Sequence, residues 1–107
     1  MAADELLLSE FLYVSVSDVA AASGLSAEDI GELIELGALE PARHAGPELS
    51  LPAQAIEAAR AIRQLQRDFE LPLAGAALVL AYRERIRELE ERVRLLECLV
   101  PEAARPR

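Results

Sequence analysis

The sequence contains no lysine and no tryptophan, and its only cysteine is Cys98. A lone cysteine excludes an internal disulfide framework and is typical of a reducing compartment. The N-terminal stretch has no basic region, and its apolar run at residues 6–8 is too short for a secretory signal peptide. No apolar run approaches the ~18 residues of a membrane span. These absences predict a cytoplasmic protein.

The absence of lysine leaves the chain strongly acidic. Asp and Glu outnumber the basic residues by 19 to 11, which gives a formal net charge of -8. DNA-binding proteins obtain much of their affinity by placing Lys and Arg against phosphates. A chain of this charge favours a basic or neutral partner over nucleic acid.

Catalytic and metal-binding patterns are also missing. His44 has no second histidine nearby, and Cys98 has no His or Asp at a useful spacing, so we expect no metal site, no cofactor and no enzyme activity. Cys98 is expected to be a buried or half-buried helix residue.

What remains is the composition of a helix-rich protein. The chain of 107 residues is 52% hydrophobic with 4% aromatic residues, and leucine and alanine dominate. Turn residues and apolar periodicity predict one domain with a helical arm. The expected elements are a strand within 12–16, helices over 17–22 and 27–36, strands at 38–39 and 49–51, and helices over 52–69 and 73–100.

Two Ser-x-x-Asp patterns mark the starts of the first two helices, at Ser15–Asp18 and Ser26–Asp29. In such a pattern the serine oxygen accepts from a free amide and the carboxylate lies at the positive end of the helix. Gly24 between the helices is expected to adopt a positive φ, Gly37 to end the second helix, and Pro52 to open the third.

The second helix of this helix-turn-helix has two chemically different sides. On one side Ile30, Leu33 and Ile34 are expected to pack against Val19, Ala20 and Leu25. On the other side three glutamates occupy the face that a recognition helix turns toward DNA: Glu28, Glu32 and Glu35. They form either an ordinary solvated face or a surface that binds a basic partner, and the helix-turn-helix context favours the latter.

The last predicted helix carries apolar residues at alternating steps of three and four: Val79, Tyr82, Ile86, Leu89, Val93, Leu96 and Val100. This seam either packs back on the domain or forms a homodimeric coiled coil, and charges of alternating sign around it favour the dimer. On the preceding helix, one face carries Arg60, Arg63 and Arg67. One interpretation is that they bind DNA or a carboxylate-rich partner, and the simpler one is that they pair with Glu57, Glu70 or the acidic surface of the same assembly.

The residues at 16–20 (VSDVA), 24–26 (GLS), Ile30 and 37–41 (GALEP) resemble the winged helix-turn-helix of MerR-type regulators. That resemblance implies a mainly helical fold with a short β wing and a long dimerising C-terminal helix. The expected division is a winged domain at 1–71, a dimerisation arm at 72–100 and a flexible tail at 101–107.

The chain departs from MerR-type regulators where they contact DNA. Such regulators usually carry an Arg-Tyr pair on the second helix, and the matching residues here are Gly31 and Glu32. With its acidic 26–41 stretch, the AARAIRQLQ run at 58–66 and the following Phe-Glu-Leu, the chain is more similar to the chaperone-modulator proteins of the CbpM family.

The CbpM resemblance implies a specific partner and outcome. It implies binding to the J-domain of a DnaJ-like, CbpA-type co-chaperone, with inhibition of its co-chaperone activity and its DNA binding. The expected contact residues are Glu28, Asp29, Glu32, Glu35 and Leu36.

Two other functions remain open at this point. One is a MerR-type transcriptional regulator that binds DNA through Arg43, Arg60 and Arg63. The other is a dimeric adaptor for a different basic partner.

Overall fold

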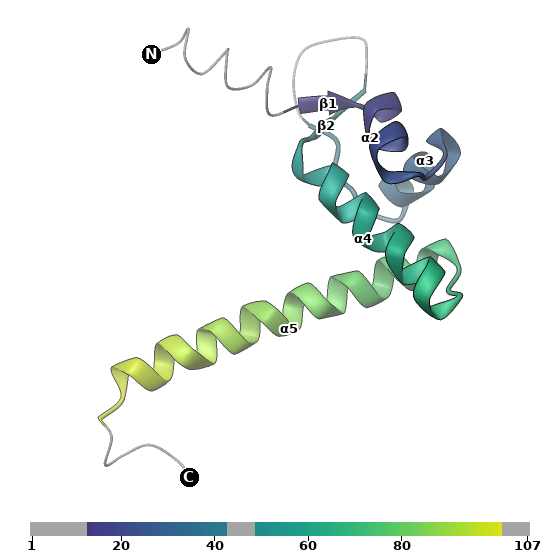
Figure 1. Ribbon diagram of the computed structural model, residues 1–107. Coiled ribbons are helices and arrows are strands. Elements are labelled where there is room, and N and C mark those ends of the chain that lie inside the picture. Colours follow the sequence, from purple (N-terminus) through teal and green to yellow (C-terminus); the bar gives the residue numbers. More distant parts are fainter. Residues whose placement is uncertain (1–12, 43–48, 102–107) are drawn as a thin grey trace, which may run out of the picture.

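The computed structural model describes residues 13–42 and 49–101, and these form a small helical domain from which one long helix projects (Figure 1). The order is strand β1 (Tyr13–Ser15), helices α2 (Val16–Ser23) and α3 (Ala27–Glu35), strand β2 (Ser50–Pro52), and helices α4 (Gln54–Phe69) and α5 (Leu73–Leu99). The predicted fold class, mainly helical with a small β element and a long C-terminal helix, is confirmed.

Both Ser-x-x-Asp patterns form the predicted caps. The Ser15 and Ser26 hydroxyls each accept from the backbone N–H of the following aspartate at 3.0 Å, and each aspartate carboxylate accepts from the serine N–H. These reciprocal bonds satisfy two otherwise free donors at each helix start. Gly24 has a φ of 84°, as predicted for the turn between α2 and α3.

Gly37 ends α3 with a φ of 78°. Its N–H donates to the Ile34 carbonyl at 3.1 Å, and the N–H of Ala38 donates to the Leu33 carbonyl at 2.9 Å. This pair of bonds is the Schellman arrangement, in which a left-handed residue turns the chain back over the last helical carbonyls. Residues 38–39 therefore belong to a turn, and the strand predicted there is wrong.

The sheet has two antiparallel strands in the described ranges, β1 and β2, with Val14 opposite Leu51. Pro52 ends β2 instead of opening α4, which begins two residues later at Gln54. The predicted start of this helix was wrong because Pro52 faces Tyr13 across the sheet. A proline at a strand end costs little because its missing N–H is not needed there.

A single core joins the sheet and all four helices of the described chain. Val19, Ile30, Leu33, Leu51 and Ile62 are its largest fully buried side chains. The predicted packing of α3 on α2 is confirmed, since Ile30 and Leu33 are buried in this core together with Val19 and Leu25.

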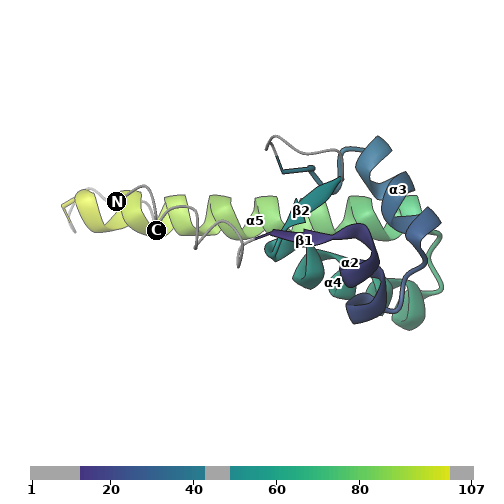
Figure 2. The same cartoon turned by 90° about the horizontal axis from the view of Figure 1, so that it is seen from above.

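Only the beginning of α5 reaches the core. Leu73, Ala76, Ala77 and Leu80 are buried, and every described residue after Leu80 is exposed. Figure 2 shows the rest of the domain gathered around one end of this helix. The radius of gyration is 18.0 Å, whereas a compact domain of this length has about 13 Å. The far half of α5 is therefore an arm that no other part of residues 13–42 and 49–101 covers.

Candidate functional site

One side of α3 carries three exposed glutamates, Glu28, Glu32 and Glu35, which together form the acidic face. Ile30 and Leu33 anchor the opposite side of the helix in the core with no exposed area. Because the apolar side fixes how α3 is rotated, the three carboxylates are held outward. Their predicted exposure is confirmed, and their role in binding stays a prediction.

Charge is segregated between the two halves of the described chain. Residues 13–42 carry six acidic residues and no basic one: Asp18, Glu28, Asp29, Glu32, Glu35 and Glu40. Helix α5 carries five glutamates and five arginines and is neutral as a whole. The described negative charge is thus concentrated on the helix-turn-helix half, with no neighbouring arginine in that segment to neutralise it.

Asp29 and Leu36, the other two expected contact residues, differ in availability. Asp29 is half-buried, and its carboxylate accepts from the Ser26 N–H at 3.4 Å in the capping box. Its structural role is thus to start α3. Leu36 follows the last residue of α3 and is 52% exposed, which leaves an apolar group beside the acidic face.

The arginines of α4 do not form the expected ion pairs. Within the described ranges the two ion pairs both lie on α5, Arg85–Glu88 at 3.0 Å and Arg94–Glu91 at 4.0 Å. Arg60 instead donates from Nε to the Ala22 carbonyl at 3.0 Å, at the end of α2. A cation is favourable there because the last carbonyls of a helix carry partial negative charge.

Arg63 lies beside the turn between α2 and α3. Its Nε is 4.0 Å from the position that a Cβ atom on Gly24 would occupy. That Nε is buried and has no hydrogen-bond partner in the described part of the chain. Arg60 and Arg63 therefore contribute to the contact between α2 and α4. Arg67 is exposed.

The seam predicted on α5 is exposed along its whole length, with side chains between 36% and 62% accessible: Val79, Tyr82, Ile86, Leu89, Val93, Leu96 and Val100. The alternative of packing back on the domain is therefore wrong. Cys98 is also exposed, contrary to the expectation of a buried cysteine, because nothing in the described chain covers this part of α5.

One apolar feature escaped sequence reasoning. The end of α3 and the first turns of α5 enclose a shallow groove, the α3–α5 groove, lined by Leu36, Gly37, Ala38, Ala74, Ala77, Leu78 and Ala81. The α5 residues recur at steps of three and four, so a common face could have been predicted. That α3 ends opposite this face is a tertiary contact, which periodicity does not reveal.

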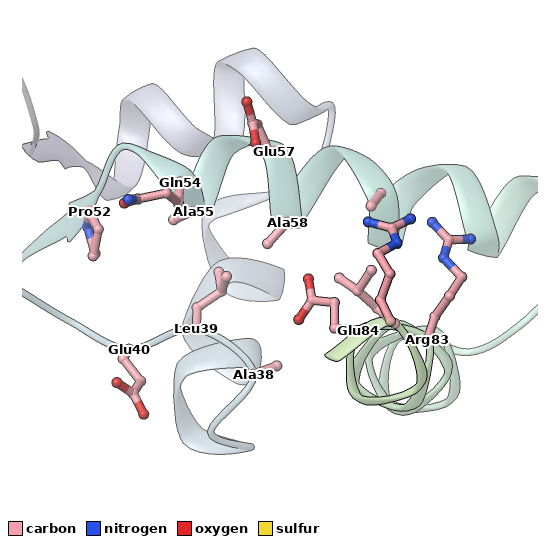
Figure 3. A pocket seen from close by; sticks show the side chains of 13 residues that line it. Ala38, Leu39, Glu40, Pro52, Gln54, Ala55, Glu57, Ala58, Arg83 and Glu84 are labelled. Carbon is pink, nitrogen blue, oxygen red and sulfur yellow. The ribbon is translucent and has the colours of Figure 1, made fainter. Parts of the chain in front are cut away.

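A second hollow, of 440 Å³, lies between residues 38–40, the start of α4, and α5 (Figure 3). Glu84 and Arg83 extend from α5 toward α4, and Glu40 and Glu57 lie on its other walls. Since both charge signs line the hollow, it has no clear preference for a cation or an anion.

Arg43 and His44 lie outside the described residues. Within the described ranges, no group of three or more His, Cys, Asp or Glu side chains is placed to hold a metal ion. No described helix is both long enough and apolar enough to cross a membrane.

Comparison with known protein families gives a match over most of the chain. A family model described as "MerR HTH family regulatory protein" matches residues 14–98, from β1 nearly to the end of α5. No curated protein matches the chain. The family match agrees with the observed order of helix-turn-helix, short sheet, and long C-terminal helix.

Proposed function

Because this chain belongs to the MerR helix-turn-helix family of regulatory proteins, we propose that it is a regulator that binds a basic protein through α3. The observation that carries this proposal is the acidic face, which stands where a DNA-binding relative needs positive charge. Phosphates approaching Glu28, Glu32 and Glu35 would meet like charge at short range, whereas a basic helix would be attracted and oriented.

The proposed partner is the J-domain of a DnaJ-like, CbpA-type co-chaperone. Support comes from the similarity of residues 26–41 and 58–66 to CbpM-type chaperone modulators, together with the exposed carboxylates of α3. By covering the basic helix of the J-domain, the chain would inhibit delivery to the Hsp70 chaperone and suppress the DNA binding of the co-chaperone. It acts in this proposal by occupying a surface and not as an enzyme.

The exposed seam of α5 supports a homodimer as the working form. Three heptads of apolar residues, spread over roughly 32 Å of helix, are exposed in the described part of the chain. A second copy would bury them in a coiled coil. Two acidic faces in one assembly would then allow two partner molecules to bind.

The proposal is tested by titrating a labelled J-domain of such a co-chaperone with the full chain at low and high salt. We expect binding that weakens as salt rises, because salt screens exposed charges. Glu32→Arg should weaken binding about tenfold or more. Glu97→Arg makes the same charge change on the exposed far end of α5 and should leave binding unchanged. Absence of binding, or equal effects of the two substitutions, would reject the proposal.

The family match supports DNA binding as a second candidate. In that case the exposed cations of α4 are Arg60 and Arg67, and Arg60 already donates to the Ala22 carbonyl. A mobility shift of duplex DNA carrying the chain's own upstream region separates the two candidates. A DNA-binding protein loses affinity steeply with salt, and we expect no shift even at low salt.

A further inference from the structure

The α3–α5 groove has no charged side chain in its lining, and one of its lining residues, Leu36, directly follows the acidic face on α3. Alanines occupy three of its four positions on α5: Ala74, Ala77 and Ala81. Because a methyl group fills little space, these alanines leave a depression between Leu36 and Leu78. Ala77 is buried and forms the floor.

The two leucines at the walls of the groove are exposed, Leu36 by 52% and Leu78 by 56%. Both lie beside buried residues of the core, so the apolar surface continues from the interior to the outside. Exposed apolar surface of this kind contributes to binding when a partner covers it.

The groove lies at the end of the acidic face. Glu28, Glu32 and Leu36 are spaced four residues apart, so they follow one another along one side of α3. The acidic face therefore leads directly into the apolar walls. Beyond the α5 end of the groove the next basic residue along the chain is Arg83, which lines the other hollow, between α4 and α5.

We infer that the α3–α5 groove receives an aliphatic side chain from a basic amphipathic helix, whose cations lie along Glu28, Glu32 and Glu35. The inference rests on the proposed function, because it completes the same surface and gives it the apolar anchor that the acidic face lacks. Protein interfaces owe most of their affinity to a few well-buried anchors, and surrounding charges determine orientation and association rate. A leucine or isoleucine matches the lining of small and aliphatic residues.

The experiment uses two synthetic helical peptides and no natural partner. The first carries lysines along one face and leucines along the adjacent face, and the second carries the same lysines with serine at every leucine position. Fluorescence anisotropy measures the affinity of each peptide for the full chain and its variants. We expect the leucine peptide to bind the wild-type chain about tenfold more tightly than the serine peptide.

Variants of the chain test whether the leucine side chains of the peptide bind in the α3–α5 groove. Leu78→Ser and, independently, Leu36→Ser should each remove most of the difference between the two peptides. Leu95→Ser is the matched control, since Leu95 is 60% exposed and lies at the far end of the same helix, and it should retain the difference. Circular dichroism confirms that each variant is folded.

The results that would contradict the groove assignment differ from those that would contradict the proposed function. Equal affinity of the two peptides for the wild-type chain, or equal effects of Leu78→Ser and Leu95→Ser, would overturn the groove assignment. The assignment would also be overturned if Leu78→Ser dissociated a dimer without changing peptide affinity, because a second copy of the chain would then occupy the groove. If the leucine peptide binds as expected and the J-domain does not, the groove stands and the partner assignment fails.

Discussion

Helices α3 and α5 each present a long face to solvent, and the two faces differ in kind. On α3 the apolar residues Ile30 and Leu33 are completely buried, and the exposed side carries three carboxylates. On α5 beyond Leu80 the charges cancel, with apolar side chains left exposed from Tyr82 to Val100. The ends differ as well. Side-chain and glycine caps close α3, whereas α5 begins after Pro72 without a side-chain cap.

This difference indicates two kinds of interaction surface. A helix that is already packed and capped gains its specificity from the charges it exposes, so α3 is suited to a reversible, salt-sensitive partner. A helix with an uncovered apolar seam gains stability from a second apolar surface, so α5 is suited to a lasting one. Reversing a charge should therefore weaken binding through α3, whereas introducing a charge into the apolar seam should weaken association through α5.

The largest effect is expected from Leu89→Arg on the seam. In a dimer this substitution places an uncompensated charge in a buried apolar position, which costs about 3–5 kcal/mol. Sedimentation velocity should therefore show a dimer for the wild-type chain and a monomer for the variant. Leu36→Arg adds the same charge to an apolar residue outside the seam and should remain dimeric. A wild-type monomer, or a dimeric Leu89→Arg chain, would remove the dimerisation role of α5.

A somewhat smaller effect is expected when α3 and α5 are compared by the loss of unfolding free energy that a leucine-to-alanine substitution causes on each. Leu33→Ala removes a fully buried side chain and should lower the free energy of unfolding by about 2–5 kcal/mol. Leu96→Ala, on a side chain that is 62% exposed, should change it by less than about 0.5 kcal/mol at protein concentrations where the chain is monomeric. Urea denaturation measures both values. Similar losses would mean that α5 is covered within the single chain.

The smallest effect concerns the start of α3. Ser26→Ala removes the hydroxyl that accepts from the Asp29 N–H at 3.0 Å and should cost about 1 kcal/mol of stability. Ser17→Ala, at an exposed serine inside α2, is the control and should be nearly neutral. Thermal denaturation gives both values. If Ser26→Ala is as neutral as the control, the cap does not determine where α3 begins.

Local patterns predicted much of this fold. Both serine caps, the left-handed Gly24, the end of α3 before Gly37, the end of α4 at Phe69 and the length of α5 follow from residues close together in the chain. Such features depend on side chains hydrogen-bonding or clashing within one helical turn. The exposure of the acidic face followed from helical periodicity in the same way.

Apart from the strand expected at 38–39, which the local turn at Gly37 replaces, the errors concern how distant segments are placed relative to one another. Pro52 looks like a helix start until β2 pairs with β1, and Cys98 looks buried until α5 is seen to leave the core. The bond from Arg60 to the Ala22 carbonyl joins residues far apart in sequence. The α3–α5 groove likewise exists only because the end of α3 lies against the beginning of α5. Sequence spacing describes each helix face but does not show which faces meet.

The most direct measurement for the acidic face is a charge swap across the proposed interface. The basic residues on the basic helix of the J-domain are replaced by glutamate one at a time. Calorimetry then gives the dissociation constant of each J-domain variant with the wild-type chain and with the Glu32→Arg chain. We predict that at least one reversed J-domain binds the Glu32→Arg chain more tightly than it binds the wild-type chain, because opposite charges again face each other. If the native J-domain binds both chains with equal affinity, α3 is not the surface that holds the partner.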